Sequence, residues 1–139
     1  MLLLDTHIWI WIIEGDARRL GRRTQQLISR AGSQEAIRIS PVTLFEVVSL
    51  HAAGRIHLAH PPEQWIRESL RAPGVRLGEL SAAVAIDAGA IPSTALPDPL
   101  DRLLVAIARQ LGAVFLTADT RILDYARATG NVRVHDAGR

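Results

Sequence analysis

Five of the 14 acidic residues stand where carboxylates could do chemistry together: Asp5, Glu46, Asp98, Asp101 and Asp119. Asp5 and Asp119 each follow a short apolar run typical of a buried strand, and ligands bind beyond the carboxyl ends of parallel strands. Glu46 lies among apolar residues of a predicted helix, where a carboxylate is costly to bury unless it is paired or bound to a cation. Asp98 and Asp101 stand at the start of another predicted helix.

The chemistry that such a group favours is metal-assisted hydrolysis. Carboxylates gathered at one place repel one another, so either one is protonated or a hard cation neutralises them. Mg²⁺ or Mn²⁺ fits best, because these ions prefer oxygen ligands and keep several waters, which leaves room for a phosphate oxygen and an attacking water. The absence of cysteine excludes a thiolate zinc site, an iron–sulfur cluster, a thiol nucleophile and a disulfide-stapled scaffold. Hydrolysis of a phosphodiester is therefore the chemical hypothesis.

Each acid also has an explanation that needs no ligand. Asp98 precedes Pro99, a residue type favoured in the first turn of a helix, and is a good N-cap. Asp101 lies three positions further on, where a capping box places its acid. Asp119 can cap the last predicted helix, and Glu46 can point outward to solvent. A non-catalytic α/β binding module, in which the acids cap helices and pair with arginines, therefore stays open as an alternative.

Short apolar strands alternate with helices along the whole chain. Strands are expected at residues 2–4, 36–40, 75–80 and 113–117, and around 132–134. Helices are expected at residues 8–13, 18–30, 41–54, 61–70, 81–89, 100–111 and 120–128. This alternation is typical of an α/β fold, an open parallel sheet sandwiched between helices. A length of 139 residues suits a single domain over residues 1–139.

The calculated pI of about 10.3 suggests a strongly basic protein, but the charge balance does not support this. All 16 basic residues are arginine, and the net charge is only +2. With one tyrosine and no lysine or cysteine, almost nothing titrates between histidine and arginine, so a slight excess of positive charge moves the pI far upward. A hydrophobic content of 48 % with 22 % charged residues predicts a well-packed globule. No apolar run approaches a membrane span and no basic leader precedes the first one, so we expect no membrane association and a cytoplasmic location.

Four separated segments resemble, in order and spacing, the signatures of PIN-domain ribonucleases, specifically the VapC toxins of bacterial VapBC toxin–antitoxin modules. They are LLLDTHIWIW, TLFEVV, PDPLDRLLVAIARQLGA and VFLTAD. The resemblance covers essentially the whole chain and implies a PIN-like fold and an endoribonuclease that depends on Mg²⁺ or Mn²⁺. It also implies an RNA substrate, a VapB-like antitoxin as partner and a homodimer. Within the same fold, a PIN nuclease that processes RNA without an antitoxin is the alternative.

The resemblance also assigns roles to individual residues. Asp98 is a fifth candidate metal ligand beside the family's acidic quartet, or only a helix cap. Thr6 and Thr117 lie next to matched acids and are expected to steady them, or a bound water, by hydrogen bonding. The quartet itself, expected to be catalytic and metal-binding, matches Asp5, Glu46, Asp101 and Asp119.

Three arginines are candidates for contact with the RNA backbone. Arg22 and Arg23 lie in the densest basic stretch, for which a solvated helix face is the alternative interpretation. Arg102 adjoins the acids and is expected either to hold a phosphate or to pair with Asp98, because a guanidinium suits both geometries.

The aromatic side chains and histidines are interpreted as structural. His7, Trp9, Trp11 and Phe45 are expected to pack in the core. Contact with substrate or metal is the alternative for His7, and a dimer contact or an antitoxin groove is the alternative for the two tryptophans. Because this interpretation leaves few aromatic rings for base stacking, we expect recognition to depend on RNA shape and phosphates.

Overall fold

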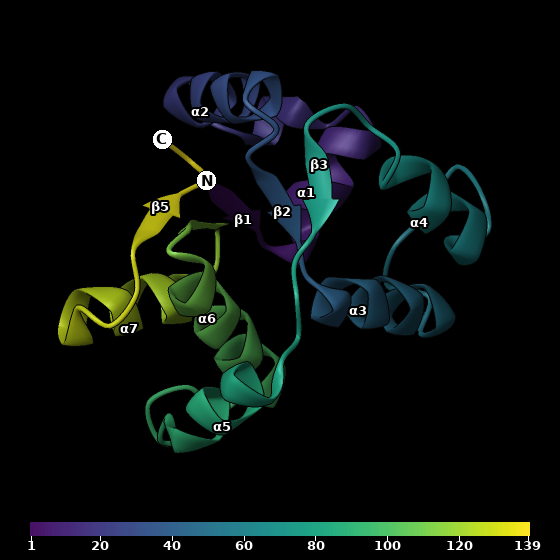
Figure 1. The fold of residues 1–139 in the computed structure, drawn as a ribbon. Helices are drawn as coiled ribbons and strands as arrows, with labels where there is room; N and C mark the ends of the chain where they lie inside the picture. Colours follow the sequence, from purple (N-terminus) through teal and green to yellow (C-terminus); the bar gives the residue numbers. More distant parts are fainter.

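The centre of the fold is a five-stranded sheet in which all neighbouring strands are parallel and the strand order is β3-β2-β1-β4-β5 (Figure 1). The structure is a computed structural model and describes residues 1–139. The strands are β1 (Leu2–Leu4), β2 (Ile37–Ile39), β3 (Val75–Leu77), β4 (Val114–Thr117) and β5 (Val134–Asp136). The predicted open parallel sheet is therefore confirmed.

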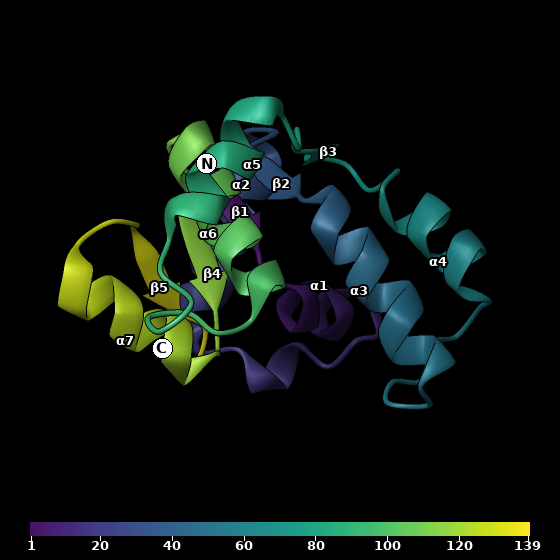
Figure 2. The same cartoon turned by 90° about the horizontal axis from the view of Figure 1, so that it is seen from below.

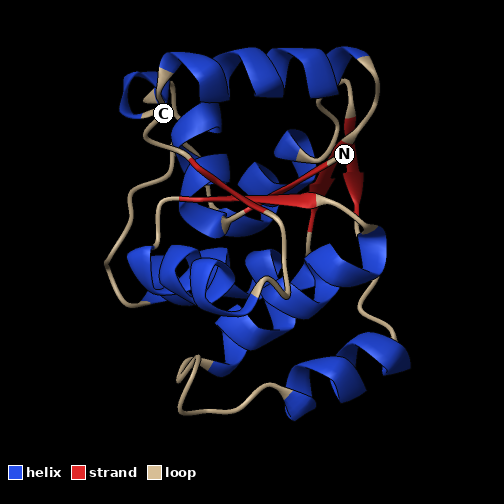
Figure 3. Cartoon of the chain, turned by 90° about the vertical axis from the view of Figure 1, so that its left-hand side faces the viewer, coloured by secondary structure: helices blue, strands red, loops and turns tan.

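Helices cover the sheet on both faces, so that the strands lie between two helical layers (Figure 3). One layer contains α1 (Thr6–Ile13), α2 (Arg22–Ser33) and α4 (Pro62–Ser69). The other contains α5 (Ala82–Ala90), α6 (Pro99–Leu111) and α7 (Thr120–Thr129). α3 (Pro41–Ala52) packs beside α4 and gives buried residues to both layers (Figure 2). None of the helices has the length and apolarity needed to cross a membrane.

The alternation of side chains along β1 separates the two cores. Leu3 is buried with the residues of α5, α6 and α7, whereas Leu2 and Leu4 are buried on the opposite face. On that second face, Trp9 of α1 packs edge-on against Trp65 of α4, with ring centroids 4.9 Å apart. The expectation that Trp9 is a core residue is confirmed, and its ring anchors α1 on the sheet.

The order of the strands reverses at β1. The chain adds β2 and β3 on one side of β1 and then returns to add β4 and β5 on the other. Asp5 follows β1 and Asp119 follows β4, and the backbone N–H of Asp5 donates to the carbonyl of Leu116 at 2.9 Å. The switch point, where open α/β sheets bind ligands, therefore lies between these two aspartates.

The main differences from the expected element boundaries lie at three places, and α1 also begins at Thr6, two residues before its expected start. The helix expected at residues 18–30 is divided into a short 3₁₀ helix, η1 (Ala17–Arg19), and α2, because Leu20 is extended and Gly21 then acts as the N-cap of α2. β3 ends at Leu77. β5 begins at Val134, after the turn at Gly130, whose φ is +66°.

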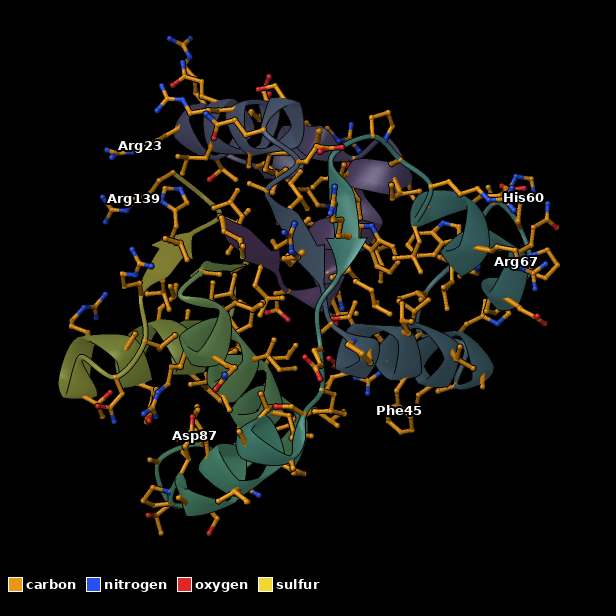
Figure 4. The ribbon with its side chains drawn as sticks, in the orientation of Figure 1. Arg23, Phe45, His60, Arg67, Asp87 and Arg139 are labelled. Atoms are coloured by element: carbon orange, nitrogen blue, oxygen red, sulfur yellow. The ribbon has the colours of Figure 1, made fainter.

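The burial predicted for Phe45 and His7 is wrong. Phe45 is 61 % exposed and points outward from α3, because the helix buries Thr43 and Val47 on its other side (Figure 4). His7 is exposed at the start of α1. In a chain with many apolar residues, an aromatic side chain in an apolar helix is not enough to define its buried face.

Candidate active site

The five singled-out acids line one cavity of about 400 Å³ at the carboxyl edge of the sheet. They arrive from four places in the chain: the end of β1, the middle of α3, the start of α6 and the end of β4. The cavity is lined by Asp5, His7, Ile8, Trp11, Glu46, Asp98, Asp101, Ala118 and Asp119. The structure therefore brings together every carboxylate predicted for the site.

Asp5 is held on both of its carboxylate oxygens. The side chain caps α1, with Oδ1 accepting from the backbone N–H of Thr6 at 2.8 Å, while Oδ2 accepts from the hydroxyl of Thr117 at 2.6 Å. Burial nevertheless raises the pKa of Asp5, since the two hydrogen bonds offset only part of the cost of burying a charge. Asp5 is thus fixed in orientation, and a nearby cation would favour its charged form.

Glu46 is held by the other threonine. The Thr6 hydroxyl donates to Oε1 of Glu46 at 2.8 Å, and this bond joins α1 to α3. Burial raises the pKa of Glu46, the bond from Thr6 opposes this, and the carboxylates of Asp5 and Asp98 add to the rise. The alternative that Glu46 points freely into solvent is therefore wrong.

Thr6 and Thr117 each support an acid that is distant in sequence. Thr6 follows Asp5 but its hydroxyl binds Glu46, and Thr117 precedes Asp119 but its hydroxyl binds Asp5. Thr117 Oγ1 also accepts from the backbone N–H of Asp119 at 3.0 Å. Both hydroxyls are in the positions expected of supporting residues.

Asp98 and Asp119 both cap helices, as the ligand-free explanation predicts. Asp98 accepts from the backbone N–H of Leu100 at 2.9 Å, and Asp119 accepts from that of Arg121 at 2.8 Å. Each cap uses only Oδ1, and both side chains still line the cavity. Capping therefore positions these carboxylates at the site and does not remove them from it.

Asp101 is the one acid of the group whose side chain accepts no hydrogen bond from the protein. The capping-box bond that would explain its position is not formed. Burial is the largest cause that raises its pKa, and the neighbouring carboxylates raise it further, to about 7. The carboxylates responsible are, in decreasing order of effect, those of Asp98, Asp119, Asp5 and Glu46. A group of this kind in a cleft is typical of a functional site.

No arginine neutralises the cavity. Arg102 does not pair with Asp98: its Nη1 donates to the carbonyl of Leu96 at 3.0 Å and so secures the loop before α6. None of the ion pairs in the structure involves an acid of the cavity. The pairing predicted for Arg102 as one alternative is therefore wrong, and no lysine or arginine lines the cavity beside the carboxylates.

The donor set fits a hard divalent cation. The cavity offers carboxylate oxygens from five residues and no sulfur ligand. As the side chains stand, no three of them surround one point at ligating distance.

Arg22 and Arg23 lie outside the cavity but at the same edge of the sheet. The start of α2 is tied to the chain after β5, because Gly21 N–H donates to the carbonyl of Ala137 at 2.9 Å, and Ala137 N–H in turn donates to that of Thr117 at 2.9 Å. Both arginines are exposed, and Arg23 extends beside Arg139 (Figure 4).

Two further residues, His7 and Trp11, line the cavity. From the sequence both are expected to pack in the core, with contact to substrate or metal as the alternative for His7. They lie four residues apart on α1, which begins directly after Asp5, so both point toward the same side of the helix. Trp11 is half-buried and His7 is exposed. The sequence feature that could have predicted this position is the spacing of His7 and Trp11 from Asp5. That spacing places both residues near Asp5 only if the helix begins at Thr6.

The sheet is open and parallel, and a cleft lined by carboxylates lies at its switch point. This combination is typical of the α/β proteins that bind ligands beyond the carboxyl ends of their strands. The PIN domain model matches residues 2–128, and the chain belongs to the PIN-domain family. It is 32 % identical over 121 residues to Ribonuclease VapC22 of Mycobacterium tuberculosis, covering 87 % of this chain and 88 % of that protein.

Two solved structures share the fold. One is VapBC2 from Rickettsia felis bound to a DNA fragment from their promoter, with a TM-score of 0.69, 14 % identity and 97 % of each chain covered. The other is DNA-bound VapBC from Salmonella typhimurium, with a TM-score of 0.66, 21 % identity, and 97 % of this chain and 96 % of that chain covered. The PIN-like α/β fold expected from the sequence is confirmed.

The hydroxyl of Thr117 offers a direct test of how the site is supported. Thr117→Val keeps the shape of this fully buried side chain but leaves Asp5 Oδ2 and the Asp119 N–H without their partner. We expect cleavage of RNA to fall by about 10- to 100-fold, the usual cost of losing a group that orients a metal ligand, while the protein stays folded. Thr117→Ser, which retains the hydroxyl, should keep most of the activity. Full activity in the valine variant, measured as kcat/KM, would contradict this role.

Proposed function

We propose that this protein is a divalent-metal-dependent endoribonuclease, the toxin of a VapBC-type toxin–antitoxin module. The observation that carries the proposal is the convergence of five carboxylates on one cavity that no lysine or arginine lines. The PIN fold and the 32 % identity to a named VapC ribonuclease support the nuclease class. The finer assignments, Mg²⁺ or Mn²⁺ as the ion and a cytoplasmic location with the RNA, belong to the proposal.

A VapB-like antitoxin is the partner that goes with this function. Two of the solved structures with a similar fold are VapBC complexes bound to DNA. The homodimer implied by the family resemblance stays a prediction, which light scattering of the purified chain tests.

We assign the chemistry to this chain's residues as follows. Asp5, Glu46, Asp101 and Asp119 hold the cation, with Asp98 as a fifth candidate ligand. When bound, a divalent cation neutralises the carboxylates and supplies a water that can attack phosphorus. Thr117 and Thr6 keep Asp5 and Glu46 in fixed orientations. In hydrolysis at this site, a carboxylate of the cluster would accept the attacking water's proton while the water oxygen bonds to phosphorus and the P–O3′ bond breaks. The 3′ oxygen would take up a proton from solvent, so that the products carry a 5′-phosphate and a 3′-hydroxyl.

The non-catalytic binding module accounts for the site less well. Helix capping explains the positions of Asp98 and Asp119. Helix capping does not explain Asp101, which caps no helix and pairs with no arginine. Burial and neighbouring charges raise the pKa of Asp101 to about 7. In a protein without a cation at this site, that arrangement would cost stability with no compensating contact.

Purified protein incubated with total RNA, with and without Mg²⁺, tests the proposal. We expect fragments with 5′-phosphate ends only when Mg²⁺ or Mn²⁺ is present, and we expect them to disappear when the cognate VapB-like antitoxin is added. Sequencing of the fragment ends identifies the target at the same time. Cleavage that continues in EDTA would contradict metal dependence, and cleavage unaffected by the antitoxin would favour a PIN nuclease that processes RNA without one.

The double variant Arg22→Ala, Arg23→Ala tests RNA contact beyond the cavity. Each arginine that neutralises a phosphate adds to the salt dependence of binding, so we expect weaker binding and a log Kd against log salt slope smaller by about 1 to 2. The matched control is Arg67→Ala, Arg71→Ala, which removes the same charge from α4 and the turn after it, at the other side of the molecule (Figure 4). A salt slope unchanged from the parent would refute the contact.

A further inference from the structure

Thr43 is a buried polar residue of α3 that lies one helical turn before Glu46. Its side chain is 0 % exposed, and its neighbours in the chain, Val42 and Leu44, are apolar. The one hydrogen-bond partner of its hydroxyl is the hydroxyl of Thr6, with 3.2 Å between the two oxygens. A valine would fill the same space without a polar group to satisfy, so packing alone does not account for the hydroxyl of Thr43.

The backbone of Thr43 is fixed at the point where α3 leaves the sheet. Ser40 follows β2 and caps α3, because its hydroxyl accepts from the backbone N–H of Val42 at 3.0 Å. The backbone N–H of Thr43 donates to the carbonyl of Ser40 at 2.9 Å, and Ser40 is itself 0 % exposed. The hydroxyl of Thr43 is therefore held on a rigid part of the fold, one turn from a carboxylate of the cavity.

The hydroxyl of Thr6 lies between Thr43 and Glu46. Its oxygen is 2.8 Å from Oε1 of Glu46 and 3.2 Å from Oγ1 of Thr43. Thr6 is 1 % exposed and begins α1, which lies beside α3 (Figure 2). The three side chains thus form a continuous series of polar contacts, which leads from the interior to the cavity that Glu46 lines.

The number of protons gives this series a direction. A hydroxyl has one proton to donate and can also accept, whereas an ionised carboxylate can only accept. The proton of Thr6 therefore goes to Glu46, which is also the nearer of its two partners. Only lone pairs of Thr6 remain for the other contact, so Thr43 is the donor there. Donation to Thr6 polarises its O–H group and strengthens the bond to the carboxylate.

Only one of the two carboxylate oxygens of Glu46 is used by the protein. Oε1 accepts from Thr6, and Oε2 accepts no hydrogen bond from the protein. A carboxylate that is held through one oxygen keeps its orientation and still has the other oxygen for a cation. Partners that orient a metal ligand in this way typically change metal affinity by about 10- to 100-fold.

We propose that Thr43 is a positioning residue for Glu46: its hydroxyl donates to Thr6, Thr6 donates to Oε1 of Glu46, and Oε2 is left for the cation. Thr43 does not line the cavity and has no hydrogen bond to Glu46, so it acts through Thr6. For its effect on activity this inference rests on the proposed function, to which it adds a residue outside the cavity. The hydrogen bonds themselves belong to the metal-free protein as well.

Calorimetry with Mn²⁺ tests the role of Thr43. Thr43→Val keeps the shape of the side chain and removes the hydroxyl. We expect it to weaken Mn²⁺ binding by about 3- to 10-fold, less than loss of a direct partner of the ligand, because Thr43 is one hydrogen bond further away. Thr43→Ser, which retains the hydroxyl, should bind Mn²⁺ as the parent does.

The matched control is Thr24→Val, which removes a buried hydroxyl from α2. Thr24 is 0 % exposed and does not line the cavity, and its hydroxyl contacts His135 and the carbonyl of Arg139. The Mn²⁺ affinity of this variant should equal that of the parent. Circular dichroism verifies that each variant is folded.

A double-mutant cycle with Thr6→Val separates this role from an effect on packing. Because Thr43 acts through Thr6, adding Thr43→Val to the Thr6→Val protein should change Mn²⁺ affinity by less than about twofold. The parent, the two single variants and the double variant are also melted without metal. Each single substitution leaves a buried hydroxyl without its partner, and the double substitution leaves none. The loss of Tm in the double variant should therefore be smaller than the sum of the two single losses.

The outcomes separate this inference from the proposed function. Parent-like Mn²⁺ affinity of Thr43→Val, an equal loss with and without Thr6, or additive losses of Tm would each overturn the role of Thr43. In RNA cleavage, Thr43→Val should lower kcat by about 3- to 10-fold and leave KM near that of the parent, because the substitution affects a metal ligand and not RNA binding. A parent protein that binds Mn²⁺ but cleaves no RNA overturns the proposed function, while non-additive losses of Tm still support the role of Thr43.

Discussion

Asp101→Asn is expected to lower the rate of RNA cleavage by on the order of 10³-fold or more, because loss of several kcal/mol of charge stabilisation by the metal costs about tenfold per 1.4 kcal/mol. Asp101 is the acid without a structural role, since its side chain caps no helix and accepts no hydrogen bond. Replacing it with an isosteric amide should therefore disturb binding of the cation and leave the fold intact. Cleavage of a labelled single-stranded RNA in Mg²⁺ or Mn²⁺ measures the effect.

The matched control is Asp124→Asn, which makes the same chemical change on the exposed surface of α7, where Asp124 pairs with Arg127. This variant should cleave at the parent's rate. Calorimetry with Mn²⁺ provides a second readout: the parent and Asp124→Asn should bind the ion, and Asp101→Asn should bind it at least about tenfold more weakly. Undiminished cleavage by Asp101→Asn, or unchanged Mn²⁺ binding, would remove Asp101 from the site and favour the binding-module interpretation.

The same substitution is expected to stabilise the metal-free protein in a way that depends on pH. In the folded chain the pKa of Asp101 is raised from 3.8 to about 7, so between these values the folded state holds a proton that the unfolded state has lost. The stability of the protein with Asp101 therefore falls as pH rises from about 4 to about 7, and the loss is complete above pH 7. Burial raises the pKa of Asp5 and Glu46 as well, and their contributions have the same sign.

Thermal melting of parent and variant at several pH values measures this effect. The difference in Tm between Asp101→Asn and the parent should be near zero at about pH 4 and should grow to roughly 3 °C or more at about pH 8. Added Mn²⁺ should raise the Tm of the parent more at about pH 8 than at about pH 5, because the ligands must be deprotonated, and should raise that of Asp101→Asn less. A Tm difference independent of pH would contradict the raised pKa, and hence the crowding of charges at the site.

The strands and the acids could be predicted from local sequence alone. Leu2–Leu4 and Val114–Thr117 are short apolar runs, and each is followed within two residues by an aspartate. Because parallel strands end at one edge, the run and the acid after it predict both the strand and the side of the sheet on which the carboxylate lies. The caps by Asp98 and Asp119 were predictable for the same reason: an N-cap depends on only a few neighbouring residues.

The sequence predicted that Thr6 and Thr117 support the acids, but it did not predict which acid each threonine binds. Thr6 and Thr117 are both expected near the acids, yet each binds a carboxylate from another part of the chain, Glu46 and Asp5 respectively. The partners are 40 and 112 residues apart, and such pairs depend on how α1, α3 and β4 pack. No local pattern contains that information.

The exposure of single aromatic residues could not be predicted. Phe45 and Trp11 lie in apolar helices in which almost every position is a candidate for burial. The position of the helix on the sheet decides which face is covered, and it leaves Phe45 on the surface and Trp11 beside the acids.

The sequence by itself determined the alternation of strands and helices, the parallel sheet and the identity of the acids, because these follow from local hydrophobic patterns and from the rule that parallel strands end together. Only the tertiary structure decided which threonine holds which acid, that Arg102 binds a loop carbonyl, and that Trp11 lines the cavity of the carboxylates. The physical reason is that the energies of these contacts depend on distances between residues far apart in the chain, and those distances are set by the packing of helices on the sheet.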